Sequence, residues 1–101
     1  GTPQTGSASG SVARGAWVRY QPLSVLAGSN LTVTLSGSGD PDLYIRFGSQ
    51  PSTTTYSCAS ESPTATERCS ITVPAGQSQA YIGVYGYSQA SFSLNASWVA
   101  P

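Results

Sequence analysis

The sequence contains no histidine, lysine or methionine, and charged residues make up only 8% of its 101 residues. About 25% is usual for soluble globular chains. Four arginines balance four acidic residues, so the formal net charge is zero. Nucleic acids and anionic membranes are bound by clustered basic side chains, and this chain has too few to form such a cluster. Both classes of partner are therefore excluded.

The missing residue types also exclude most catalytic chemistry. A serine or cysteine nucleophile is normally activated by a neighbouring base, and this chain has neither histidine nor lysine to act as one. The nucleophile elbow Gly-x-Ser-x-Gly does not occur either. Asp40 and Asp42 could form an acid and base pair, but no pattern in the sequence builds a cleft around them. We therefore predict that the chain is not an enzyme.

Long apolar runs are absent as well, since no stretch approaches the roughly 20 apolar residues of a transmembrane helix. Residues 1–15 consist largely of Gly, Ser, Thr and Ala and bury too little apolar surface to order themselves. We predict a flexible linker over residues 1–15 and one folded domain over residues 16–101. Such a linker indicates a module attached to a larger protein.

Only two cysteines are present, Cys58 and Cys69. With no histidine and no second cysteine pair, a structural zinc site would lack half of its ligands, so a disulfide is the preferred interpretation. A disulfide in a small, charge-poor chain is typical of secreted proteins. Closing a loop of this size stabilises a fold by about 3 kcal/mol in the chain-entropy model.

From residue 16 onward, apolar and polar residues alternate with the period of a β-strand, and no helical period occurs. Turn-forming Gly, Pro, Asn and Asp separate the alternating segments. The first segment is interrupted at Pro22, and it is predicted to form a hairpin with the second. Trp17 and Trp98 are expected to pack in the core near the two ends of the chain. The expected strands cover residues 17–25, 31–36, 42–47, 69–73, 80–87 and 91–99.

Short strands at this spacing predict an all-β fold, an antiparallel β-sandwich. The motifs then add a family resemblance over about residues 16–99. The run Gly-Asp-Pro-Asp-Leu-Tyr-Ile-Arg-Phe-Gly at residues 39–48 is followed by Cys58, Glu67 and Cys69, then by Val-Pro-Ala-Gly at 73–76 and a tyrosine-rich segment at 81–88. This pattern resembles the bacterial pre-peptidase C-terminal domain, and is similar to the collagen-binding domains of clostridial collagenases.

The resemblance implies a jelly-roll-like sandwich of about seven to eight strands with one disulfide. It also implies a non-catalytic accessory domain on the C-terminal side of a secreted bacterial hydrolase, most often a peptidase. Such a domain is expected to bind an insoluble extracellular polymer, either a protein such as collagen or a polysaccharide. The alternative is an appendage for secretion or maturation that is removed by proteolysis and has no ligand of its own.

The candidate binding surface is aromatic. Tyr81, Tyr85 and Tyr87 alternate along one predicted strand, and Gly83 is expected to leave a gap between them. Tyrosine rings stack on sugar or prolyl surfaces while the hydroxyl group stays in water. Tyr44 and Arg46 share the non-core face of another strand and could extend this surface. The alternative is that these tyrosines only cover half-buried sheet surface.

Asp40 and Asp42 are the candidate metal ligands, with Glu67 as a possible third carboxylate. Calcium prefers six to eight oxygen ligands, so backbone carbonyls and waters would have to complete such a site. Calcium-binding relatives carry acidic residues in the segment leading into the domain, whereas the first acidic residue here is Asp40. Aspartates beside Pro41 also form turns by accepting hydrogen bonds from backbone amides. We therefore expect no required cofactor, and calcium stays an alternative.

Overall fold

The computed structural model describes all 101 residues as an all-β fold without helices, so no helix could cross a membrane. Nine strands are present, one or two more than expected, because one strand lies in the predicted linker and another is only two residues long. They are β1 (Thr2–Val12), β2 (Trp17–Arg19), β3 (Leu23–Ser24), β4 (Asn30–Ser38), β5 (Pro41–Phe47), β6 (Cys58–Ser60), β7 (Glu67–Thr72), β8 (Gln79–Gly86) and β9 (Ala90–Ala100).

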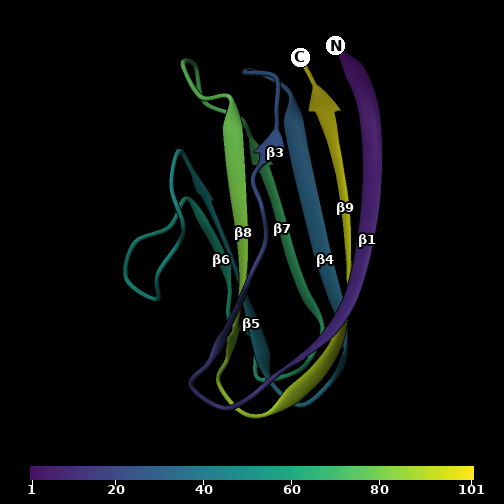
Figure 1. Ribbon diagram of the computed structural model, residues 1–101, viewed down its shortest axis with the longest axis vertical. Helices are drawn as coiled ribbons and strands as arrows, with labels where there is room; N and C mark the ends of the chain where they lie inside the picture. Colours follow the sequence, from purple (N-terminus) through teal and green to yellow (C-terminus); the bar gives the residue numbers. More distant parts are fainter.

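The strands form the predicted sandwich of two antiparallel sheets (Figure 1). One sheet has the order β1-β9-β4-β7, and the other has the order β2-β8-β5-β6 with β3 also paired to β8. The two chain termini lie side by side at one end of the molecule, because β1 runs antiparallel to β9 along its whole length.

The core lies between the sheets and is built by the alternation seen in the sequence. In β4, Leu31, Val33 and Leu35 are buried, while the residues between them are less buried. Leu43 and Ile45 of β5 face this layer from the opposite sheet. Because strand side chains alternate between faces, their neighbours Asp42, Tyr44 and Arg46 are placed on the outer face of β5.

The linker predicted for residues 1–15 is wrong for residues 2–12, which form β1 and pair with β9 from Thr2 opposite Ala100 to Val12 opposite Ala90. The composition of this segment does not indicate a strand, because β1 buries little besides Val12 and is held mainly by backbone hydrogen bonds. Gly10 has a packing role here, since a Cβ at this position would come within 3.1 Å of the Phe92 ring.

The predicted hairpin between the first two segments is also wrong. β2 and β3 pair with β8, whereas β4 pairs with β7 and β9 in the other sheet. The chain therefore crosses between sheets at the turn that contains Gly28. The break at Pro22 is confirmed, because β2 ends at Arg19 and β3 begins at Leu23.

The predicted disulfide between Cys58 and Cys69 is present, with a Cα–Cα distance of 6.2 Å. Cys58 begins β6, the edge strand of one sheet, and Cys69 lies in β7, the edge strand of the other. The bond therefore joins the two sheets along one open side of the sandwich. The loop between these strands contains Glu61 and leads to Glu67.

Candidate functional site

Pairing between β5 and β8 brings most of the predicted binding residues onto one surface. Tyr44 lies opposite Gly83, and Arg46 lies opposite Tyr81. Tyr85 lies opposite both Asp42 of β5 and Trp17 of β2. The two strands carrying the predicted residues are therefore neighbours.

This surface is not the open tyrosine platform that the sequence suggested. Tyr44 is only 1% exposed. Its ring packs against Trp17 and Tyr56, with centroid separations of 5.4 Å in both cases. The gap above Gly83 is filled by Trp17 and by Pro51 from the loop after β5. The predicted surface is thus divided, with Tyr81 at one end and Tyr85 and Tyr87 at the other.

Trp17 borders this surface, and its predicted position was wrong. It was expected in the core, but it lies on the outer face, where its ring centroid is 5.2 Å from that of Tyr85. The guanidinium of Arg19 is 4.2 Å from the Trp17 ring centroid and donates a hydrogen bond to the Pro51 carbonyl oxygen. Trp98, in contrast, packs against the core as expected.

Tyr44 is fixed by more than its aromatic neighbours. Its hydroxyl donates a short hydrogen bond to Glu61 Oε2. Burial, followed by this contact with Glu61, raises the pKa of Tyr44 well above its usual value. Tyr44 therefore stays neutral and acts as a fixed wall. Glu61 had no distinguishing signal in the sequence, because its loop folds over β5 only through long-range contacts.

Beside this wall lies a surface cleft of about 670 Å³, which we call the tyrosine cleft. Tyr87 is the most exposed large side chain on its rim, with 67% of its surface accessible, and Tyr85 is half-buried beside it. The lining residues are Asp40, Asp42, Tyr44, Thr53, Glu61, Pro63, Tyr85 and Tyr87.

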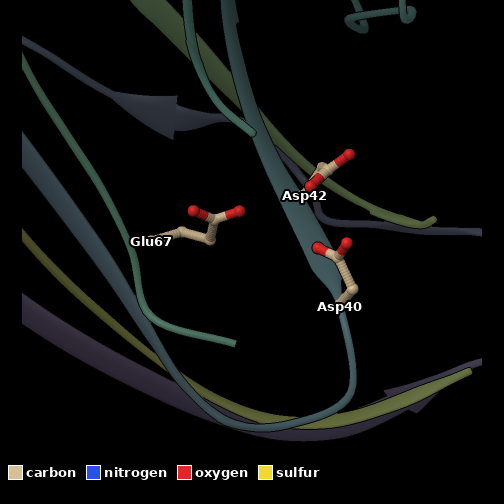
Figure 2. Close-up of side chains that lie close together, drawn as sticks. All are labelled: Asp40, Asp42 and Glu67. Carbon is tan, nitrogen blue, oxygen red and sulfur yellow. The ribbon is translucent and has the colours of Figure 1, made fainter. Parts of the chain in front are cut away.

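The structure brings both predicted metal ligands together with the third carboxylate. One oxygen from each of Asp40, Asp42 and Glu67 lies within 4.8 Å of the others (Figure 2). Asp40 is placed by the turn before β5, where its carbonyl accepts hydrogen bonds from the amides of Tyr87 and Ser88. Arg46 is not part of this cluster, because its guanidinium donates to the Gln50 carbonyl oxygen instead.

The electrostatics of this cluster are strongly unfavourable for negative charge. Burial is the largest cause, and together with the charges of Asp40, Glu67 and Glu61 it raises the pKa of Asp42 from 3.8 to about 7. Every charged neighbour that acts on Asp42 is therefore another carboxylate. Without a counterion, Asp42 would be partly protonated near neutral pH.

The fold and this site define a small, disulfide-linked β-sandwich with a surface cleft and no catalytic constellation. Comparison with known proteins then gives the family. Residues 19–86 match the bacterial pre-peptidase C-terminal domain, and the chain belongs to this family. It is therefore a non-catalytic domain of a secreted, extracellular bacterial protein.

Similar sequences occur in several bacterial proteases. The chain is 40% identical over 84 residues to alkaline serine exoprotease A of Vibrio alginolyticus, a match covering 80% of the chain and 15% of that protein. It is 34% identical over 70 residues to neutral protease of Vibrio proteolyticus, a match covering 68% of the chain and 11% of that protein. The matched region is thus a small part of each protease.

The fold also resembles a solved structure of different sequence. PliG of Aeromonas hydrophila, a periplasmic inhibitor of g-type lysozyme, superimposes with a TM-score of 0.74 at 21% sequence identity. The match covers 91% of this chain and 83% of PliG. At this identity the likeness concerns the fold alone.

Proposed function

We propose that the chain is an accessory domain that is covalently linked to the catalytic domain of a secreted bacterial protease. The matches to a serine exoprotease and to a neutral protease support this proposal, because the chain is similar to only 15% and 11% of their lengths. The remaining length of such a protein has room for a separate catalytic domain.

The domain holds that enzyme on an insoluble extracellular polymer through the tyrosine cleft. The observation that carries this proposal is the position of Tyr87, which exposes 67% of its surface on the rim of a cleft beside Tyr85. Exposed tyrosines next to a concavity are typical binding anchors, because a large rigid ring loses little conformational entropy on contact. Retention on the polymer raises the local concentration of the linked enzyme.

The favoured polymer is a fibrous protein such as collagen, because the similar proteins are proteases. Polysaccharide is the second polymer class, since tyrosine also stacks on sugar rings. The zero formal net charge suits either polymer, because a neutral solid offers no strong charge for a protein to match.

Sedimentation of the 101-residue chain with insoluble collagen, chitin and cellulose tests the proposal. We expect retention on collagen, and we expect Tyr87→Ala to lower it at least tenfold, because a hot-spot side chain contributes about 2 kcal/mol or more. Tyr81→Ala is the matched control, since Tyr81 is outside the cleft at the other end of β8. Equal retention of both variants would disprove the cleft assignment.

If the chain is retained on chitin or cellulose but not on collagen, the bound polymer is a polysaccharide and not a protein. If the chain sediments with none of the three, the binding proposal fails. The domain would then be interpreted as an appendage for secretion or maturation, and the mature protease should be found without it.

A further inference from the structure

Three acidic side chains, contributed by both sheets, meet at one end of the sandwich. Asp42 belongs to β5 of one sheet, Asp40 precedes this strand, and Glu67 begins β7 of the other sheet. Figure 2 shows the carboxylate of Glu67 directed toward those of the two aspartates. One oxygen from each carboxylate lies within 4.8 Å of the other two.

Two of these carboxylates are almost completely removed from solvent, with Asp42 5% exposed and Glu67 2% exposed. Each of the three still has a buried oxygen without a hydrogen-bond donor, namely Asp40 Oδ1, Asp42 Oδ1 and Glu67 Oε2. An unsatisfied buried oxygen on a charged group is costly, and native structures contain few of them. Three in one cluster indicate a missing positive partner.

The hydrogen bonds of Glu67 hold its carboxylate in one orientation. Oε1 accepts bonds from the Ser60 hydroxyl at 3.0 Å, the Ser62 amide at 3.0 Å and the Ser62 hydroxyl at 2.6 Å. These three donors fix the carboxylate and leave Oε2 without any partner. Such an arrangement is typical of outer-shell contacts that orient a metal ligand.

No arginine supplies the missing charge, because every charged side chain that acts on Asp42 is a carboxylate, and Arg14 and Arg68 are exposed. Arg19 is held against Trp17 and the Pro51 carbonyl, and Arg46 donates to Gln50. The remaining acid of the tyrosine cleft, Glu61, is already bonded to the Tyr44 hydroxyl.

We propose that Asp40, Asp42 and Glu67 bind a hard divalent cation, and that Ca²⁺ is the preferred ion. Carboxylate oxygens without histidine or thiolate ligands select hard ions over zinc or copper. Ca²⁺ binds oxygens at 2.3–2.6 Å, so one ion can contact atoms up to about 5 Å apart, whereas the shorter Mg²⁺ bonds span about 4 Å. The adjoining tyrosine cleft gives water access to complete the coordination.

The bound ion would link β5 of one sheet to β7 of the other, at the end of the sandwich beyond the disulfide. It would also neutralise the acidic floor of the tyrosine cleft, which Asp40 and Asp42 line. This inference does not depend on polymer binding, because cation binding is measured without any polymer.

The test is to add calcium to the 101-residue chain in chelator-treated buffer. Isothermal titration calorimetry measures the heat of binding, and thermal unfolding measures the change in Tm. Extracellular calcium modules have Kd values of about 10⁻⁴ to 10⁻³ M. At ten times Kd, binding raises the folded-to-unfolded ratio about elevenfold. This corresponds to a rise in Tm of about 5 to 10 °C for a domain of this size. MgCl₂, and NaCl at matched ionic strength, should give a smaller shift.

Asp42→Asn and Asp40→Asn should abolish both the binding heat and the calcium-dependent rise in Tm. Asp40→Asn, at the least buried of the three positions, keeps the test valid if a variant at a buried position fails to fold. Glu61→Gln is the matched control, because Glu61 lines the same cleft outside the cluster. It removes one nearby negative charge but no ligand, so the binding heat and the calcium-dependent rise in Tm should persist. Absence of binding heat and Tm shift at 10 mM CaCl₂ would overturn the proposal, as would an unchanged response of both aspartate variants.

Discussion

The indole ring of Trp17 lies directly over Gly83, so that a Cβ built on this glycine would come within 2.9 Å of Trp17 Cζ3. Pro51 approaches the same position to 3.1 Å from the loop after β5. The absence of a side chain at Gly83 therefore allows β2 and this loop to cover the centre of β8. This contact separates Tyr81 from the tyrosine cleft.

We expect Gly83→Ala to destabilise the domain by about 1 to 3 kcal/mol, the usual cost of inserting a methyl group into a well-packed site. Alanine is otherwise no worse than glycine within a strand, so the cost comes from the clash with Trp17 and Pro51. Urea unfolding followed by tryptophan fluorescence measures the change. Ser91→Ala, at an exposed position of β9, should stay within about 0.5 kcal/mol of the parent chain. If Gly83→Ala leaves the free energy of unfolding unchanged, the Trp17 ring moves aside without cost.

Most of the sandwich could be predicted from the sequence because the core imposes a period of two on its strands. β4, β5 and β9 each alternate core residues with polar ones, and all were expected close to their observed bounds. β1 could not be found in this way. Its partner β9 is at the opposite end of the chain, and backbone pairing of this kind leaves no apolar pattern in the sequence.

The site was predictable only in part for a related reason. Alternation correctly placed Tyr44 on the outer face of β5, but it could not show that Trp17 and Tyr56 would cover its ring. Asp40 and Asp42 were identified as a pair because they are close in sequence. Their approach to Glu67 depends on how the two sheets stack, and this is decided by packing across the whole core.

The disulfide should contribute about 3 kcal/mol to stability, since it closes a loop with a sequence separation of 11 residues. We expect Cys58→Ala/Cys69→Ala to lower the free energy of unfolding by that amount in urea titrations. Dithiothreitol should weaken the parent chain by a similar amount and leave the double variant unaffected. A reductant effect that persists in the double variant would contradict a role for this bond.

Removal of residues 1–12 should make the chain more prone to self-association. β1 is the polar, exposed edge strand of its sheet, and without it the unpaired edge would be β9, which carries the core residues Phe92, Leu94 and Ala96. Size-exclusion chromatography with light scattering should show concentration-dependent oligomers, and the Tm should fall. Thr5→Lys, at an exposed position of β1, serves as a control that keeps the strand and should stay monomeric. A truncated chain that remains monomeric with an unchanged Tm would mean that β1 does not protect this edge.

The buried carboxylate of Asp42 should make the cation-free domain less stable as the pH rises. Its pKa is raised from 3.8 to about 7 in the folded state, so between these values the folded chain binds more protons than the unfolded chain. Stability therefore falls with increasing pH by up to about 1 kcal/mol per pH unit over this window, and becomes level above it. Urea unfolding at a series of pH values in chelating buffer measures the slope. Other carboxylates also titrate there, so the informative quantity is the difference from Asp42→Asn, whose amide cannot titrate. If both chains show the same slope from pH 4 to pH 7, Asp42 is ionised in the folded domain, and its carboxylate is better solvated than the packing around it indicates.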